Sequence, residues 1–301
     1  MSLLGSKPGS DFCESAEYQG TTLLQFVERC FPEAWRSFFV RKNVVNAIEI
    51  ADKYIKKKAK EEIYALDQQG HKFLTYHTEP EMRLMFEAFN RVSPKNVKVV
   101  ILGQDPTPQE GKATGRAFSV ENPRTVGSVM NVLLEVALEG WSVDLSNGDL
   151  SKWEKQGVLL LNSALTIAKI EYINKDDFKT KRKQISHLGF WSEFTKLLIK
   201  YVSDLPEPSV WMLWGNVAQD ILTKEPSLIS RPKNYVLKGG HPSPLGGAGG
   251  MNTFFAGNYF YCANVFLYEK RHKVFIDWGL VTGKSKKYEV GSILNPCPQY
   301  Q

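Results

Sequence analysis

The sequence predicts an α/β protein: a single domain in which helices flank a central four-stranded, mostly parallel sheet. The first observation behind this is a set of four short apolar runs, bounded by turn residues, at 97–102, 157–161, 209–214 and 235–238. The second is that the stretches between these runs are long enough to hold helices. Runs that are apolar on both faces are typical of parallel strands covered by helices.

A third observation is that each run closes on a glycine or a polar side chain. The first run ends at Gly103-Gln104-Asp105, and the later runs lead to Asn162, Asn216 and His241. In open parallel sheets, ligands bind outside the carboxyl ends of the strands. We therefore expect Asp105, Asn162, Asn216 and His241 to converge on one pocket.

The N-terminal part of the chain is expected to be helical. Residues 1–20 are rich in Gly, Ser and Pro and predict a flexible arm, whereas 21–69 show helical periodicity. The lysine-rich stretch 53–62 indicates a solvated helix face rather than a DNA-binding patch. Residues 73–90 predict a connector followed by a helix.

Helices are also expected between and after the later strands, at 128–138, 190–202 and 259–267, with Asp277-Trp278 closing the core. The charged stretch 168–185 predicts a surface excursion, and the polar tail from Thr282 predicts disorder. The expected domain boundaries are 1–20 for the arm, 21–281 for the folded domain and 282–301 for the tail.

Composition bounds the class of protein. With 301 residues and 43% hydrophobic content, the chain can bury a core without help from a disulfide or a metal. The net charge of +6 and pI near 8.9 suit a polyanionic partner without requiring one. No apolar run reaches the about 18 residues of a membrane span, and no signal-peptide pattern is present. A soluble intracellular protein, nuclear or cytoplasmic, is expected.

The cysteines give no sign of a metal site. Cys13, Cys30, Cys262 and Cys297 lie far apart and form neither a CxxC pair nor a Cys/His cluster. Reduced thiols are therefore expected rather than disulfides or zinc ligands.

The residues at the strand ends suit the cleavage of an N-glycosidic bond. An Asn amide at 162 can donate to and accept from the edge of a carbonyl/NH heterocycle. His241 can donate to charge developing on a carbonyl oxygen, Asp105 can orient water or stabilise a cationic sugar, and Phe118 offers a flat stacking face. Each of these residues alone has a common structural role, but together they suit a pyrimidine nucleoside substrate.

From about residue 73 to 280 the chain resembles the family 1 uracil-DNA glycosylases (uracil-N-glycosylase type). Motifs of that family occur in its order at Gly103-Gln104-Asp105-Pro106, Phe118-Ser119-Val120, Leu159-Leu160-Leu161-Asn162, Met212-Leu213-Trp214-Gly215 and His241-Pro242-Ser243-Pro244-Leu245. The resemblance implies the uracil-DNA glycosylase-like fold for the domain. It also implies a monofunctional hydrolase that starts base-excision repair.

The resemblance assigns roles to residues. Asp105 and His241 would be catalytic, with Asp105 activating water and His241 stabilising the uracil anion through O2. The residues expected to bind substrate are Gly103, Gln104, Phe118, Asn162 and Thr107. Those expected to contact DNA are Ser128, Gly215, Asn216, Ser243 and Leu245, with Leu245 as the wedge that fills the vacated stack. The base must leave the helix to reach such a site.

The resemblance implies a monomer that acts on uracil in single- and double-stranded DNA, without metal, cofactor or membrane. A replication or repair partner is not identified.

Two departures from the family pattern affect the loop after the first strand. Thr107 stands where the family has a tyrosine that bars the thymine methyl, and Pro108 replaces a histidine. Because a contact that discriminates one methyl carries only about 1–3 kcal/mol, we hypothesise better tolerance of 5-substituted uracils or thymine. The alternative is that a neighbouring side chain refills the gap.

The loop after Leu245, residues 246–252, is richer in glycine than the family's loop. Glycine is costly to order, so we expect weaker insertion into DNA or a slower rate.

The sequence also suggests two alternative functions, of which the second is disfavoured. The chain could be a glycosylase-fold DNA-binding or scaffold protein with weak or no catalysis, which the altered residues at 107 and 108 keep in play. A nucleotide-binding α/β enzyme is disfavoured, since no glycine-rich phosphate loop opens a helix after the first strand.

Overall fold

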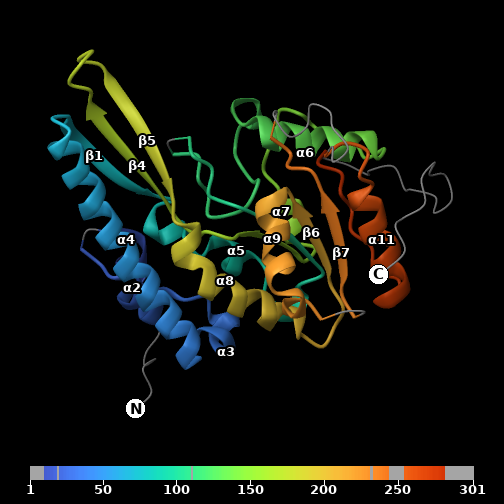
Figure 1. The fold of residues 1–301 in the computed structure, drawn as a ribbon. Helices are drawn as coiled ribbons and strands as arrows, with labels where there is room; N and C mark the ends of the chain where they lie inside the picture. The colour runs from blue at the N-terminus through green and yellow to red at the C-terminus, as the bar shows by residue number, and fades with distance from the viewer. Residues whose placement is uncertain (1–9, 19, 110, 231–232, 244–253, 282–301) are drawn as a thin grey trace. The chain divides into compact units, whose positions relative to one another are not determined.

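The computed structural model describes residues 10–18, 20–109, 111–230, 233–243 and 254–281 (Figure 1). The chain divides into two compact units. Unit 1 comprises Met1–Asn90, Gln104–Gly115 and Asn162–Leu198, and unit 2 comprises Arg91–Gly103, Arg116–Leu161 and Ile199–Gln301.

Unit 1 begins with helices, as the periodicity of 21–69 predicts. They are α1 (Ser10–Ser15), α2 (Leu23–Cys30), η1 (Glu33–Trp35), α3 (Arg36–Phe39) and α4 (Lys42–Gln68). A capping box starts α2, because the Thr22 hydroxyl accepts from Gln25 N–H while the Gln25 side chain accepts from Thr22 N–H. Three lysines of α4 pair with acids one turn away, for example Lys58 with Glu62 at 2.8 Å, which fits a solvated helix face.

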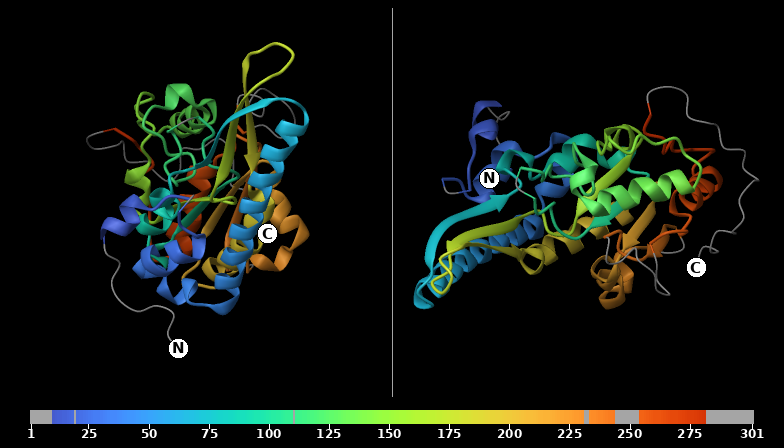
Figure 2. Two further views of the ribbon diagram at one scale, coloured as in Figure 1. Left: turned by 90° about the vertical axis from the view of Figure 1, so that its left-hand side faces the viewer. Right: turned by 90° about the horizontal axis from the view of Figure 1, so that it is seen from above.

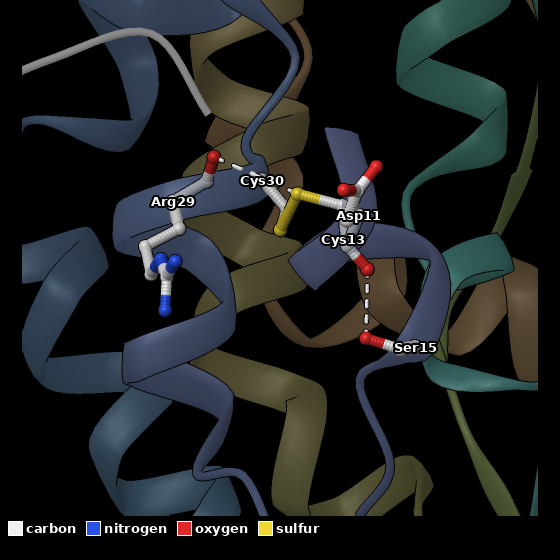
Figure 3. Close-up of a disulfide and its surroundings, with 5 residues drawn as sticks. All are labelled: Asp11, Cys13, Ser15, Arg29 and Cys30. Carbon is white, nitrogen blue, oxygen red and sulfur yellow. Dashed lines mark hydrogen bonds between the residues drawn. A yellow bond between two sulfur atoms is a disulfide. The ribbon is translucent and has the colours of Figure 1, made fainter. Parts of the chain in front are cut away.

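A disulfide joins α1 to α2, which corrects the expectation of four reduced cysteines. Figure 3 shows the bond between Cys13 and Cys30, whose Cα atoms are 5.7 Å apart. The sequence could not reveal it, because the two cysteines are 17 positions apart and only the packing of α1 on α2 brings them together. Helix α1 itself lies within the stretch expected to be a flexible arm and was not predicted.

A three-stranded antiparallel sheet is the second feature of unit 1 that the sequence did not predict. Its strands are β1 (Lys72–Glu79), β4 (Ile167–Ile173) and β5 (Thr180–Ser186), in the order β1-β4-β5. The stretch 168–185 is therefore a hairpin that pairs with β1, rather than an irregular excursion, and 73–79 is a strand rather than a connector. Most residues of β5 are exposed on both faces, so its sequence lacks the apolar alternation that marks a strand.

Helix α4 packs along β1, as Figures 1 and 2 show. Two short elements, η2 (Met82–Leu84) and α5 (Glu87–Arg91), follow β1, and α8 (Leu188–Ser203) follows β5 and confirms the helix predicted at 190–202. The core of unit 1 is aromatic, with ring centroids 5.1–6.4 Å apart among Trp35, Phe38, Phe39, Phe86, Phe89 and Phe194.

Unit 2 contains the predicted four-stranded sheet. Its strands are β2 (Val99–Gly103), β3 (Val158–Asn162), β6 (Val210–Trp214) and β7 (Tyr235–Gly239), in the order β3-β2-β6-β7. The pairs β2–β6 and β6–β7 are parallel, with Val210 opposite both Val99 and Tyr235. All residues of β2, β3 and β6 are buried, which explains their continuous apolar runs.

Helices cover this sheet. They are α6 (Gly127–Leu138), α7 (Ser151–Glu154), α9 (Asn216–Lys224) and α11 (Tyr259–Lys270), with η3 (Pro94–Asn96), η4 (Pro123–Thr125) and η5 (Pro226–Leu228) in the connections. Helices α9 and α11 both contact β6 (Figure 1). The helices predicted at 128–138 and 259–267 are confirmed.

The core of unit 2 closes on Trp278, as predicted. Its ring is fully buried, and its backbone carbonyl accepts from Trp153 Nε1 at 2.9 Å. Two buried acids, Glu135 in α6 and Glu139 directly after it, also hold this region together. Glu135 accepts from the N–H groups of Ala256 and Gly257, and Glu139 accepts from those at the start of α11.

Candidate active site

The Asp105 carboxylate lies in unit 1, directly after the end of β2, and both of its oxygens are hydrogen-bonded. Ser186 Oγ donates to Oδ1 at 2.6 Å, and Gln104 Nε2 donates to Oδ2 at 2.7 Å. Burial raises the pKa of Asp105 above its ordinary value, while the hydrogen bonds from Ser186 and Gln104 oppose that rise. The carboxylate is thus held in one orientation within a partly desolvated setting.

Ser186 is a residue that the sequence analysis missed. It ends β5, and its Oγ also accepts from Leu188 N–H at 3.1 Å, so the hydroxyl hydrogen is directed to Asp105. The next residue, His187, is anchored by Thr166, whose hydroxyl lies 2.9 Å from His187 Nδ1 and accepts from Trp191 Nε1. No motif marks Ser186, which is 81 positions from Asp105 and belongs to a strand that was not predicted.

Asn162 lies in the same unit, at the end of β3. Ala164 N–H donates to the carbonyl of Gln104 at 2.8 Å, which ties the segment after β3 to the loop that carries Asp105. The Asn162 side chain is 6% exposed, and within the described part of the chain its amide has no hydrogen-bond partner. We name Gln104, Asp105, Asn162 and Ser186 the Asp105 cluster.

Thr107 and Pro108, where the sequence predicts departures from the family pattern, follow Asp105 in unit 1. Thr107 is half-buried and Pro108 is exposed, both in irregular backbone. Gly103, the last residue of β2, is buried in unit 2.

His241 lies in unit 2, in the loop after β7, and packs against Gly215. The φ of Gly215 is +86°, and a Cβ added there would lie 2.9 Å from the Cβ of His241. Glycine is thus required by both the backbone and the close approach. Gly215 N–H donates to the carbonyl of Gly239 at 2.9 Å, which fixes the turn after β6 against the end of β7.

The hydrogen bonds of His241 define its protonation. Ser243 N–H donates to Nδ1 at 3.0 Å, so Nδ1 carries no hydrogen and the neutral ring has its hydrogen on Nε2. Burial lowers the pKa of His241, which favours this neutral form. Nε2 is therefore a neutral hydrogen-bond donor.

Phe118 is held in a strained conformation close to the same turn. Its φ is +59°, which is rare for an aromatic residue. The neighbouring backbone is fixed by Ala117 N–H donating to Leu160 and Val120 N–H donating to Gly148, at 3.1 and 3.0 Å. The Phe118 ring meets Trp214, which precedes Gly215, edge-on with centroids 5.5 Å apart. We name Phe118, Gly215, His241 and Ser243 the His241 cluster.

The remaining predicted DNA contacts also lie in unit 2. Ser128 is half-buried in the first turn of α6, and Asn216 is exposed as the first residue of α9. Asn131 Nδ2 of α6 donates to the carbonyl of Pro242 at 2.8 Å, which links this helix to the His241 loop. Leu245 and the loop 246–252 lie outside the described residues.

The structure thus places Asp105 and Asn162 in unit 1, and Phe118 and His241 in unit 2. The convergence of both clusters on one pocket stays a prediction. Within the described ranges, no group of three or more His, Cys, Asp or Glu side chains is placed to hold a metal ion. No helix in those ranges is long and apolar enough to cross a membrane.

Comparison with known proteins identifies relatives of the chain. Residues 89–257 match the family described as the uracil DNA glycosylase superfamily. A protein of Campylobacter jejuni subsp. doylei named uracil-DNA glycosylase is 40% identical over 204 residues, which are 67% of this chain and 79% of that protein. A protein of Dictyostelium discoideum with the same name is 36% identical over 202 residues, 66% of this chain and 53% of that protein.

Solved structures show the same fold. The mimivirus uracil-DNA glycosylase superposes with a TM-score of 0.58 at 23% identity, covering 93% of this chain and 98% of that one. A mimivirus UNG variant in complex with UGI gives a TM-score of 0.62 at 24% identity, covering 83% and 89%.

Proposed function

Because this chain belongs to the uracil-DNA glycosylase superfamily, we propose that it hydrolyses the N-glycosidic bond of uracil in DNA and so starts base-excision repair. The single observation that carries this is the Asp105 carboxylate, oriented by two hydrogen bonds beside the segment that bears Asn162. The enzyme is a monofunctional hydrolase, since none of the motif residues is a lysine that could act as a nucleophile.

Asp105 acts on water and on the sugar. Its fixed carboxylate orients a water molecule for attack on the anomeric carbon, and its negative charge stabilises the cationic sugar as the bond to the base breaks. Partial desolvation strengthens this charge interaction, because water screens it less.

The leaving uracil carries the negative charge that develops. Nε2–H of His241 donates to O2 of the base, and because His241 is neutral it does so without giving up its proton. The Asn162 amide pairs with the O4 and N3–H edge, and Phe118 stacks on the ring. The two clusters act on the same nucleotide, which is extruded from the helix.

The DNA backbone is held at Ser128, Gly215, Asn216 and Ser243, and Leu245 enters the vacated stack. These contacts to phosphate fix the position of the strand but do not read its sequence. The protein acts as a monomer on single- and double-stranded DNA. The glycine-rich loop 246–252 slows insertion into duplex DNA, so excision from single strands is expected to be faster.

Thr107 broadens the choice of base. A threonine is smaller than the tyrosine of the family, so more room is left at C5 of the pyrimidine. We predict that the ratio of kcat/KM for 5-hydroxymethyluracil to that for uracil falls about 10–200-fold in Thr107→Tyr. Matched oligonucleotides that carry U, 5-hydroxymethyl-U or T at one position measure this ratio. Wild-type activity confined to U would show that a neighbouring side chain fills the space.

The proposed function is tested by uracil release. Wild-type protein should release free uracil from an oligonucleotide and leave the strand intact, and Asp105→Asn should abolish release while DNA affinity is retained. A wild-type protein that binds DNA with no release would instead indicate a glycosylase-fold scaffold.

A further inference from the structure

The tip of the β4–β5 hairpin exposes an aromatic ring that no packing explains. Phe178 is 82% exposed, more than any other large hydrophobic side chain in the described chain. Its φ is +53°, in the left-handed region that aromatic residues rarely adopt. The hairpin turn, visible at the end of β4 and β5 in Figures 1 and 2, therefore holds this ring in solvent at a cost in backbone strain.

The turn is ordered by its own hydrogen bonds. Asn174 Oδ1 accepts from the N–H groups of Asp176 and Asp177, at 2.8 and 3.2 Å. Phe178 N–H donates to the carbonyl of Asn174 at 2.9 Å, and Asn174 N–H donates to Lys179 at 3.0 Å. The backbone that carries Phe178 is thus ordered by the turn before any partner binds, which lowers the entropy lost on binding.

The hairpin around this ring is basic. Its six cationic side chains, against three acidic ones, are Lys169, Lys175, Lys179, Lys181, Arg182 and Lys183. Four of these cations pair with acids: Lys169 with Glu79, Lys181 with Asp177, Arg182 with Glu171 and Lys183 with Glu62. The other two, Lys175 and Lys179, stand before and after Phe178 in the sequence of the turn, and among the described residues neither forms an ion pair.

An aromatic face between cations suits single-stranded nucleic acid. A base stacks on the ring whatever its identity, and the lysines attract the phosphates beside it. An acidic peptide would pair with the lysines, but it has no planar base to stack on an exposed aromatic ring. We propose that Lys175, Phe178 and Lys179 form a second DNA site, the hairpin tip, which stacks an unpaired base of the substrate strand.

The hairpin also sets the distance from this site to the reacting base. Strand β5 begins beside the tip at Thr180 and ends at Ser186, which holds Asp105. At about 3.4 Å per residue, the tip lies roughly 20–27 Å from the Asp105 carboxylate. A strand with duplex-like stacking, at about 3.4 Å per nucleotide, spans this distance in roughly six to eight nucleotides, and a more extended single strand spans it in fewer. This spacing rests on the proposed function, whereas binding at the tip does not.

The first test measures binding of the full chain to a fluorescent single-stranded oligonucleotide of mixed sequence that contains no uracil. Phe178→Ala should weaken binding about five- to tenfold. Leu138→Ala, which removes another side chain that is 70% exposed, is the matched control and should leave affinity unchanged. Equal affinity of wild type and Phe178→Ala would overturn the proposal, whether or not the protein excises uracil.

A glycine variant separates binding from folding. Phe178→Gly relieves the strain at a φ of +53°, so its melting temperature should equal or exceed that of the wild type while DNA affinity falls as in Phe178→Ala. A parallel loss of melting temperature and affinity would mean that the ring is structural.

The second test measures how many nucleotides separate the uracil from the base that stacks on Phe178. In single-turnover excision below saturation, Phe178→Ala should slow the reaction on uracil flanked by about twelve nucleotides per side and leave it unchanged with about three per side. The same loss on both substrates would refute the spacing. Excision by the wild type that is unaffected by Phe178→Ala on the long substrate would refute a role for the hairpin tip while leaving the proposed function intact.

Discussion

At the scale of single residues, the position of one hydroxyl controls the acid at the centre of the proposed reaction. Ser186 Oγ donates to Asp105 at 2.6 Å and opposes the rise that burial causes in the pKa of that carboxyl. Its loss in Ser186→Ala should raise the pKa of Asp105 further. The acidic limb of the kcat/KM profile should then move to higher pH, because the ionised carboxylate is the active form.

The pH profile of Ser192→Ala is the matched control, because Ser192 lies in α8 and its hydroxyl donates only to the carbonyl of Gly189. It should match the wild type. A Ser186→Ala enzyme with a lower rate but an unmoved acidic limb would show that Ser186 does not act through Asp105.

Burial of Asp105 also has a consequence for stability. Since its pKa in the folded protein is raised above the ordinary 3.8, the folded state binds the proton more tightly than the unfolded state. The protonated carboxyl therefore favours folding at low pH, and this contribution is lost as pH rises through the raised value. Asp105→Asn should melt higher than the wild type near pH 7 and at the same temperature near pH 3, as thermal denaturation would show. A melting temperature near pH 7 below that of the wild type would contradict this.

The chemical role of a residue could be predicted from the sequence only where the residue stands in a motif or at the end of a strand. Asp105, Asn162, Phe118 and His241 each stand in such a place, the first two in unit 1 and the last two in unit 2. Ser186 has no such mark, because its partner is distant in sequence and only the fold of the hairpin brings the two together.

At the scale of elements, the turn after β6 positions His241, the histidine to which we assign stabilisation of the leaving base. Gly215 combines a φ of +86° with contact to the His241 side chain, so Gly215→Ala should displace the ring as well as strain the backbone. Misplacement of about 1 Å can cost on the order of 100-fold in rate. We predict a loss in kcat of that order, measured at saturating substrate.

Gly70→Ala is the matched control, because Gly70 has a φ of +74° but its nearest neighbour would be 3.4 Å from an added Cβ. Both variants should lose comparable stability, and only Gly215→Ala should lose activity. Equal activity in the two would show that the close approach to His241 does not matter.

The buried strands could be predicted from the sequence, whereas the exposed hairpin could not. Strands β2, β3 and β6 are buried throughout, and their apolar runs identify them in the sequence. The β4–β5 hairpin escaped prediction because solvent covers much of both faces of β5, so its composition reads as a charged loop. The Cys13–Cys30 disulfide was not predicted either, because it depends on how two helices pack.

At the scale of the whole molecule, we propose that residues from both clusters act on one nucleotide. The order of the family motifs along the chain and the net charge of +6 agree with a DNA substrate, and the family match covers both clusters as far as residue 257. The sequence could predict this joint action from the strand ends. Reaction rates test this joint action. When two groups stabilise the same transition state, the effects of their substitutions on the rate are not independent.

The most direct measurement is a double-mutant cycle of single-turnover uracil excision with Asp105→Asn, His241→Gln and the double variant. We expect the wild type to release uracil, and we expect the rate of the double variant to fall by much less than the product of the two single losses. Single losses that multiply fully in the double variant, or a wild type that releases no uracil, would contradict this expectation.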